Sequence, residues 1–556
     1  MLWPGPGPSR TPRWLNGGME KSEDREGQGS VEAEGTAEDK GPDLRSVFSV
    51  GLLTLLSRIL GLLREAVRAS FLGTGPFADA FQFAFQIPNM FRSLVAEGAV
   101  SSAVVPVLTR YVRGSDKDEL KSVRENYLCA WFLLVSVVTL AGVLFSGYFL
   151  SLLMDVGQDK AELTARLTKI LFWYLLFIGL AASLQGILFA HGRFTGASFS
   201  PILFNLAFIA IGLVVAPYYE EEQQAFVFAG AVLVGGLLQL FLLASLVWRL
   251  GVRPRIQWPF RHAGVREIFK LLVPVVFGAG IYQLNLFISL MLAWRFEDHG
   301  YVAALGYSSR LMEVVLGVFV FALSTVSLTT LSRLAADKDE QGFADTLGQV
   351  LRLTLFITVP SAVGLFLLRQ PIVSLLFESG EFKKSSLRLT ADVFQYHIVG
   401  LCFVGMARVL VSAFYSLKNI RTPVLAALAN LLVCVPLAWW LSSGPMEYKG
   451  IALAASVSSI VQVVLLMVLL GSQVKLFDFR RLFRSIHRCL CCSALMGAAV
   501  WPAAALLEGG QHGKLMLGVL VFGVIFAAAG LYFLLSRIAG MEEGTMLLRG
   551  LRRKRS

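Results

Sequence analysis

Long apolar segments follow one another from residue 46 to residue 538, and they constrain the fold more than any other feature of this chain. A helix that crosses a bilayer needs about 20 residues. Hydrophobic residues make up 55% of the chain, and charged residues make up 16%, against about 25% in soluble domains. These values exclude a soluble globular enzyme, a disordered protein and a fibrous protein. We expect an all-α polytopic membrane protein with about 14 transmembrane helices. The expected spans are residues 46–72, 79–112, 126–154, 163–190, 196–217, 225–249, 266–295, 301–334, 343–368, 390–417, 420–443, 449–472, 487–508 and 514–538.

Charges between the spans predict the orientation of the chain. Basic residues gather in alternate loops and after the last span, although the loop at 369–389 is an exception. Because Lys and Arg prefer cytoplasmic loops, this bias explains most of the net charge of +12 without a nucleic acid partner. An even number of spans then places both termini in the cytoplasm. Residues 1–44 are expected to be a disordered cytoplasmic tail, and residues 539–556 a basic cytoplasmic tail.

An internal repeat divides the spans into two halves. The stretch that begins at Leu108 is similar to the stretch that begins at Leu331, and Ser200-Pro201 matches Thr422-Pro423 at an offset of about 222 residues. An even number of spans separates the copies, so the halves run in the same direction. We expect two six-helix lobes, residues 45–250 and 251–473, followed by two additional helices at 474–538. A substrate site between such lobes lies near the middle of the membrane.

Arginines inside the spans are the candidate binding groups. Arg58, Gly61, Arg64 or Glu65, and Arg68 share one face of the first span at 3.6 residues per turn. An arginine at bilayer depth is costly unless it faces water or a partner. Further charged residues within spans are Asp79, Arg92 and Glu97 in the second, Arg310 and Glu313 in the eighth, and Arg408 in the tenth.

Two interpretations of these arginines are weighed. Arg68 with Glu65, or Arg310 with Glu313, can form structural ion pairs, and Arg68 is expected to reach the membrane interface from the end of its span. For the other arginines we favour a wet cavity with more guanidinium groups than carboxylates. Such a cavity suits an anion that carries phosphate, because the planar guanidinium matches phosphate geometry. The expected substrate-binding arginines are Arg58, Arg64, Arg92 and Arg310.

Other features bear less on chemistry. Pro88 is expected to break the second span and let it bend, and Gly61 permits close helix approach. His487 with Cys489, Cys491 and Cys492 lacks the paired spacing of a zinc site, so no metal and no cofactor are expected. No nucleophile–base set appears, and therefore an enzyme is not expected.

Several motifs together resemble one family of bacterial membrane proteins. The similar stretches are Ser57-Arg58-Ile-Leu-Gly61 with Arg64-Glu65, Ala78-Asp79-Ala-Phe81, Pro88-Asn89-Met-Phe-Arg92, Ala96-Glu97-Gly98-Ala99, Ser309-Arg310-Leu-Met-Glu313 with Gly317, Leu376-Phe377-Glu-Ser-Gly380-Glu-Phe382, and Phe414-Tyr-Ser416 with Thr422-Pro423. They resemble the signature of the MurJ (MviN) lipid II flippases. That family belongs to the multidrug/oligosaccharidyl-lipid/polysaccharide exporter superfamily.

The resemblance implies a function and a set of site residues. The protein would flip lipid II, an undecaprenyl-diphosphate-linked peptidoglycan precursor, to the outer leaflet of the bacterial inner membrane by alternating access. The substrate-binding arginines would be the four named above, and the expected gating or structural residues are Asp79, Gly61, Pro88, Asn89, Glu97, Glu313 and Arg408. Asp79, near the outer end of its span, would pair with a cation or cap a helix. Expected partners are lipid II, membrane lipids and cell-wall synthesis enzymes.

The chain also departs from the family pattern. Some members have a sodium site with an acid in the seventh span, where this chain has Ser289, and the eleventh span has Asn430 but no acid. Sodium coupling is therefore not expected, and the membrane potential is a candidate driving force. Three other functions stay open: a flippase for another lipid-linked saccharide, a cation-coupled drug exporter, and an inert scaffold. The basic cavity argues against the drug exporter.

Overall fold

The computed structural model describes residues 44–94, 103–153, 158–252, 258, 260–296, 300–509 and 513–546. Most of these residues are helical and no strand occurs among them, which confirms the all-α prediction. The helices of the first half are α1 (Leu44–Leu72), α2 (Pro76–Arg92), α3 (Val105–Arg113), α4 (Lys117–Leu153), α5 (Gln158–Ala190), α6 (Phe194–Val214), the 3-10 turn η2 (Ala216–Tyr218) and α7 (Glu221–Trp248). The remaining helices are α8 (Ala263–Trp294), α9 (Tyr301–Val315), the π-helical turn η3 (Leu316–Val320), α10 (Phe321–Ala336), α11 (Glu340–Leu367), α12 (Arg369–Phe377), α13 (Lys384–Ser416), α14 (Arg421–Ser442), α15 (Glu447–Gln473), α16 (Phe479–Gly509) and α17 (Lys514–Ile538).

The helices are long and apolar enough for a membrane protein. Among the described residues, 10 helices can cross a membrane by length and composition, or 11 if the two parts of α8, bent by 46°, form one span. The other expected spans correspond to α1, to α2 with α3, and to α9 with α10, which carry charges or are interrupted. The total of about 14 spans therefore stays a prediction.

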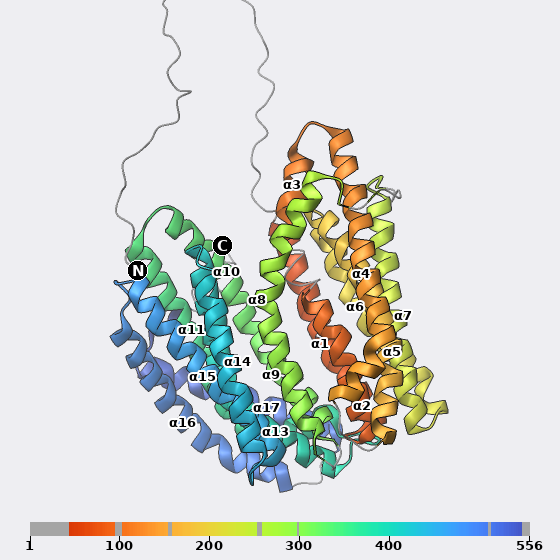
Figure 1. Cartoon of the computed structure of the whole chain (residues 1–556). Helices are drawn as coiled ribbons and strands as arrows, with labels where there is room; N and C mark the ends of the chain where they lie inside the picture. Colours follow the sequence, from red (N-terminus) through yellow and green to blue (C-terminus); the bar gives the residue numbers. More distant parts are fainter. Residues whose placement is uncertain are drawn as a thin grey trace, which may run out of the picture. The chain divides into compact units, whose positions relative to one another are not determined.

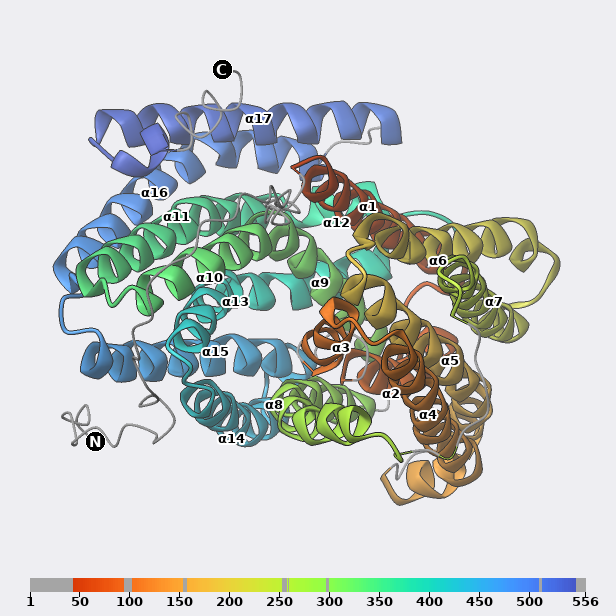
Figure 2. The same cartoon turned by 90° about the horizontal axis from the view of Figure 1, so that it is seen from above.

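Helix packing repeats between the two halves of the chain (Figures 1 and 2). In the first half α5 packs against α2, α4 and α7, and α6 packs against α7. In the second half α13 packs in the same way against α9, α11 and α15, and α14 packs against α15. The same pairs of spans thus meet in each half, as a parallel repeat requires. The last two helices, α16 and α17, pack against each other and against α11 and α12.

Both halves also interrupt the corresponding span with π-helical residues. Helix α2 continues through the buried Pro88 to Arg92 and then passes into π-helical geometry at residues 93–94. Pro88 therefore does not break the helix, because the turn that follows it stays α-helical. In the second half η3 separates α9 from α10. Such π-helical turns occur frequently at functional sites.

Two segments differ from their expected form. The expected loop at 369–389 contains the helix α12, which begins with Arg369 and has Pro371 in its first turn. The expected C-terminal tail begins later than predicted, because Met541 and Glu543 are buried in the folded body. Glu543 contacts Arg352 of α11 (Oε1 to Nε, 3.2 Å) and accepts a hydrogen bond from Ser485 of α16 (3.0 Å). Residues 1–43 and 547–556 lie outside the described residues.

Removal of one partner from the Arg352–Glu543 pair is expected to destabilise the protein. Both side chains are less than 10% exposed, so Glu543→Gln leaves the Arg352 charge buried without its carboxylate. Breaking a buried pair in this way costs about 3–5 kcal/mol. Thermal unfolding in detergent should show a lower midpoint for Glu543→Gln, and the double variant Arg352→Met with Glu543→Gln should recover part of the loss. An unchanged midpoint for the single variant would contradict the pairing.

Candidate functional site

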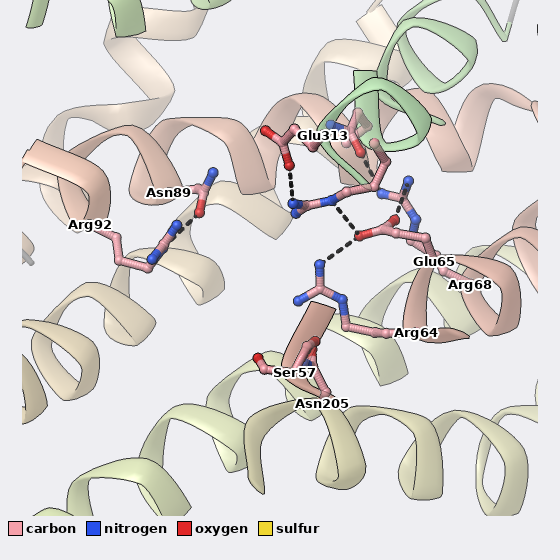
Figure 3. A network of polar contacts seen from close by, with 10 residues as sticks. Ser57, Arg64, Glu65, Arg68, Asn89, Arg92, Asn205 and Glu313 are labelled. Carbon is pink, nitrogen blue, oxygen red and sulfur yellow. Dashed lines mark hydrogen bonds and ion pairs between the residues drawn. The ribbon is translucent and has the colours of Figure 1, made fainter. Parts of the chain in front are cut away.

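Three arginines share one carboxylate where α1 faces α9 (Figure 3). Glu65 Oε1 lies 2.6 Å from Arg64 Nη2 and 3.8 Å from Arg310 Nε, and Glu65 Oε2 lies 2.9 Å from Arg68 Nη2. Arg310 Nη1 also contacts Glu313 Oε2 at 2.6 Å, one turn further along α9. The ion pair between Arg310 and Glu313 is therefore present, but Arg310 also reaches across to α1. We call these residues, with Arg58 and Arg92, the arginine network.

The members of the arginine network differ in how far their side chains are buried. The side chains of Arg64 and Arg68 are 10% and 4% exposed, whereas those of Arg310 and Glu313 are 36% and 47% exposed. The Arg64 guanidinium also lies 5.4 Å from the centre of the Phe204 ring. The buried arginines are thus held by the protein itself, and Arg310 is accessible to a ligand.

Arg68 does not reach the membrane interface, so that prediction is wrong. Its side chain turns inward because Glu65, one turn earlier, and Gln82 of α2 provide partners. Arg68 Nη1 donates a hydrogen bond to Gln82 Oε1 at 2.5 Å. The guanidinium also lies 5.5 Å from the centre of the Phe81 ring and 4.8 Å from that of Tyr307.

Arg58 and Arg92 contact different parts of the site. A Cβ atom at Gly317 would lie 1.8 Å from Arg58 Nη1, so the Arg58 guanidinium packs directly on η3. Arg92 Nε donates a hydrogen bond of 2.9 Å to Asn89 Oδ1, within its own helix (Figure 3).

The arginine network has more positive than negative charge. Among the contacts of the described residues, the three guanidinium groups of Arg64, Arg68 and Arg310 share two carboxylates, those of Glu65 and Glu313. Arg64, Arg68 and Arg310 gather around the single carboxylate of Glu65, so like charges lie close together there. Guanidinium groups prefer bidentate, charge-assisted contacts with phosphate or carboxylate oxygens. The described part of the site is therefore suited to an anion.

The structure does not bring every predicted residue into this network. The half-buried Arg408 lies on α13, and none of the described residues forms an ion pair with its guanidinium. A Cβ atom at Gly61 would lie 3.9 Å from Asn205, so this glycine is not required by close packing. Glu97 lies outside the described residues.

Asp79 caps the first turn of α9. Its carboxylate is 1% exposed and accepts hydrogen bonds from the backbone N–H groups of Gly300 and Ala303, both at 2.8 Å. A carboxylate at a helix N-terminus is stabilised by the unpaired N–H groups and by the helix dipole. Lys160 Nζ of α5 lies 3.5 Å from Asp79 Oδ2. Asp79 therefore both caps a helix and pairs with a cation.

Further contacts close this end of the molecule around Asp79. Thr74 Oγ1 donates to Ser386 Oγ at 2.8 Å, the Tyr307 hydroxyl donates to the Gly73 carbonyl at 3.0 Å, and Glu381 N donates to the Ser70 carbonyl at 2.8 Å. These contacts join the connection between α1 and α2 to α9 and to the segment after α12. We call this set of contacts, between residues 70–79 on one side and residues 300–307 and 380–386 on the other, the seam.

Glycines with positive φ lie on both sides of the seam. Gly73, Gly300 and Gly380 have φ angles of 55°, 100° and 56°. A Cβ atom at Gly300 would lie 2.2 Å from the Thr74 carbonyl oxygen, and one at Gly380 would lie 2.1 Å from the Ser70 carbonyl oxygen. The seam thus requires glycine at these positions, because a side chain would disfavour the positive φ angle and would clash with the opposite backbone.

A chain of amides joins three helices elsewhere in the second half. Asn285 of α8 donates to Asn430 of α14 at 2.8 Å, and Asn430 donates to Gln462 of α15 at 3.2 Å. Helices α8 and α14 correspond to the seventh and eleventh spans, in which Ser289 and Asn430 stand and the family's sodium site is not expected. Within the described ranges, no group of three or more His, Cys, Asp or Glu side chains is arranged to hold a metal ion.

Sequence reasoning missed three residues of the site: Gln82, Lys160 and Tyr307. Gln82 and Tyr307 lie on helices that contain predicted residues, but neither carries a charge that would attract attention. Lys160 lies near the start of an apolar span, where a lysine is expected to point to the membrane surface. Only the packing of α5 against α2 places its ammonium beside Asp79.

Comparisons with known proteins give a consistent result. The family described as lipid II flippase MurJ matches residues 68–521 of the chain. A probable lipid II flippase MurJ of Vibrio cholerae is 33% identical over 522 residues, which cover 90% of this chain and 98% of the relative. Another from Treponema pallidum is 36% identical over 435 residues, which cover 76% of this chain and 81% of the relative.

Solved structures show the same fold. A lipid II flippase MurJ in an inward closed conformation superposes with a TM-score of 0.72 at 24% identity, covering 88% of this chain and 99% of that one. An inward-facing multidrug resistance MATE family transporter of the MOP superfamily superposes with a TM-score of 0.65 at 13% identity, covering 77% of this chain and 98% of that one. At these identities the likeness concerns the fold.

Proposed function

Because this chain belongs to the MurJ family of lipid II flippases, we propose that its arginine network binds the diphosphate of the lipid that the family transports. The chain flips lipid II, the undecaprenyl-diphosphate-linked precursor of peptidoglycan, and is a multi-pass protein of the bacterial inner membrane. It is a transporter rather than a catalyst.

The single observation that carries the proposed binding mode is the surplus of guanidinium groups around Glu65 and Glu313. Lipid II carries two phosphates and peptide carboxylates, which are the anions that surplus arginines bind well. Arg310 has two carboxylates for partners, and its side chain is partly exposed, so a diphosphate can replace them. Arg64 and Arg68 stay buried and hold Glu65 in position. The proposed ligand contacts are those of Arg58, Arg92 and Arg310, whereas Arg64, which the sequence predicts as a binding residue, is proposed to support Glu65 instead.

We propose that the seam is the outer gate of an alternating-access cycle. Helix α1 runs from the N-terminal end of the folded chain to the seam, so the seam lies on the opposite side of the membrane from residue 44. Basic residues flank the start of α4 at the other end of the molecule, which favours the cytoplasm for that end. With both termini cytoplasmic, the seam faces the periplasm and closes the path outward. The two repeated halves, residues 45–250 and 251–473, would then rock against each other.

The membrane potential is the proposed driving force. An inside-negative potential favours outward movement of negative charge by about 2.3 kcal/mol per charge per 100 mV. The same field returns the empty, positively charged arginine network inward. The amides at Asn285 and Asn430 carry no charge to hold a sodium ion, which supports this choice. Cell-wall synthesis enzymes are proposed as neighbours that receive the flipped lipid.

A leaflet assay in cells tests the function. Cells depleted of their own lipid II flippase should regain outward-facing lipid II, and viability, when they express this chain. A protein that flips another undecaprenyl-diphosphate-linked saccharide would restore neither. If the chain were a scaffold, rescue would survive the simultaneous change of Arg58, Arg64 and Arg310 to alanine, whereas we expect rescue to be lost.

A further inference from the structure

A buried lysine accompanies Asp79 at the seam and comes from the first half of the chain. Lys160 lies near the start of α5, and its side chain is 9% exposed. Its ammonium lies 3.5 Å from Asp79 Oδ2 and 4.1 Å from the centre of the Trp294 ring, at the end of α8. A buried ammonium needs a counter-charge or an aromatic face to offset its lost hydration, and Lys160 has both.

The partners of Asp79 belong to two different groups of helices. Lys160 and Asp79 lie on α5 and α2, which pack against each other in the first half. The two backbone N–H groups that bind Asp79 belong to Gly300 and Ala303 at the start of α9, which packs on α13 of the second half. When the seam opens, Asp79 therefore loses both N–H groups and keeps Lys160.

The same opening changes the surroundings of Lys160. Trp294 is the last residue of α8 in the second half, and its ring packs on Phe83 of α2, so in the proposed opening this contact and the one to Lys160 separate together. The ammonium then loses its aromatic face and retains the carboxylate. In the sealed state the Lys160 ammonium contacts both Asp79 and Trp294, and in the open state it keeps its contact with Asp79.

We propose that Lys160 is a positioning residue that compensates Asp79 when α9 leaves, and thereby allows the outer gate to open. The Asp79 carboxylate is 1% exposed in the sealed state, so loss of the two N–H contacts costs less when a cation stays beside it. Lys160 lowers the free energy of the open state more than that of the sealed state, because only the sealed state has the N–H groups of α9 as an alternative. This inference rests on the proposed outer gate, but its test does not use transport alone.

The seam offers a direct reporter of its own closure. Thr74 Oγ1 and Ser386 Oγ are 2.8 Å apart, so the pair Thr74→Cys with Ser386→Cys should form a disulfide when the seam is sealed. The rate of disulfide formation under mild oxidation, in proteoliposomes without lipid II, measures the sealed fraction. The parent protein, which keeps its six native cysteines, and each single cysteine variant serve as blanks.

In the protein with Thr74→Cys and Ser386→Cys, the further change Lys160→Met should make the disulfide form faster. Its flipping rate should fall roughly tenfold, which is a typical size for coupling between two sites. Lys160→Arg should restore both values towards those of the parent. Asp79→Asn should crosslink more slowly, because it weakens the cap on α9. In the Asp79→Asn background the further change Lys160→Met should alter crosslinking little, since no carboxylate remains to be compensated.

The opposite results would overturn the proposal. Slower or unchanged crosslinking in Lys160→Met would mean that Lys160 supports the seal itself or plays no part in it. An equal effect of Lys160→Met with and without the Asp79 carboxylate would indicate general damage to the fold. Loss of flipping in every variant with the crosslinking pattern intact would count against the proposed function and leave the role of Lys160 standing.

Discussion

Alanine at Gly300 or Gly380 is expected to stop flipping by preventing closure of the seam. The new Cβ atom would lie 2.2 Å from the Thr74 carbonyl oxygen or 2.1 Å from the Ser70 carbonyl oxygen, and neither backbone atom can rotate away. Overpacking of this kind costs typically about 1–3 kcal/mol, and the positive φ adds about 1–2 kcal/mol. A combined cost near 3 kcal/mol shifts the ratio of sealed to open protein by about 100-fold. Flipping in proteoliposomes and Thr74→Cys/Ser386→Cys crosslinking should both fall.

Two other glycines provide matched controls for the strain alone. Gly192 and Gly251 have φ angles of 72° and 75°, and a Cβ atom at either position would meet nothing within 4 Å. Alanine there carries the conformational cost without the clash, so some stability should be lost while flipping and crosslinking persist. If Gly192→Ala abolished flipping as fully as Gly300→Ala does, the close approach across the seam would not be the cause.

Removal of the Arg310 guanidinium is expected to have the second large effect. Arg310→Ala leaves Glu65 and Glu313 without their shared cation and removes a guanidinium whose side chain is partly exposed. Loss of a charged contact to the ligand in this partly buried site costs about 2–3 kcal/mol, which corresponds to a loss of flipping of roughly 30-fold to 150-fold. Arg310→Lys should recover only part of the rate, because an ammonium cannot hold two oxygens in one plane.

The matched control for Arg310 is an arginine on the surface. Arg166 forms a pair with Glu162 on α5, and its side chain is 61% exposed. Arg166→Ala should flip lipid II at the rate of the unchanged protein, since exposed pairs contribute little. Near-normal flipping by Arg310→Ala, at equal amounts of folded protein in the membrane, would remove Arg310 from the binding site.

Much of this fold was predictable because membrane helices are specified locally. The apolar segments and the similarity of the stretches at Leu108 and Leu331 gave the helices and the repeat, which the packing of α5 and α13 then reproduces. Arg64 and Arg310 were recognisable because a charge at bilayer depth needs an explanation. We expected the second span to be interrupted at Pro88. The α-helix instead continues through Pro88 and becomes π-helical after Arg92.

The remaining features depend on contacts between residues far apart in the chain. Arg68 turns inward because it contacts Gln82 and Tyr307. The residues next to Arg68 in the sequence do not predict either contact. Lys160 meets Asp79 only when α5 packs on α2. No motif in the sequence singles out Gly300, and its role follows from the distance between a Cβ atom placed at this position and the Thr74 carbonyl oxygen, which is 2.2 Å. Tertiary proximity of this kind is absent from composition and periodicity.

The central claim is that surplus guanidinium groups bind the diphosphate of the lipid. Its most direct test is the affinity of the purified protein for undecaprenyl diphosphate compared with undecaprenyl monophosphate, measured for the unchanged protein and for Arg310→Ala. We predict that the unchanged protein prefers the diphosphate, that added salt weakens this preference, and that Arg310→Ala largely loses it. Equal affinity for the two lipids, or an Arg310→Ala protein that still prefers the diphosphate, would contradict the claim.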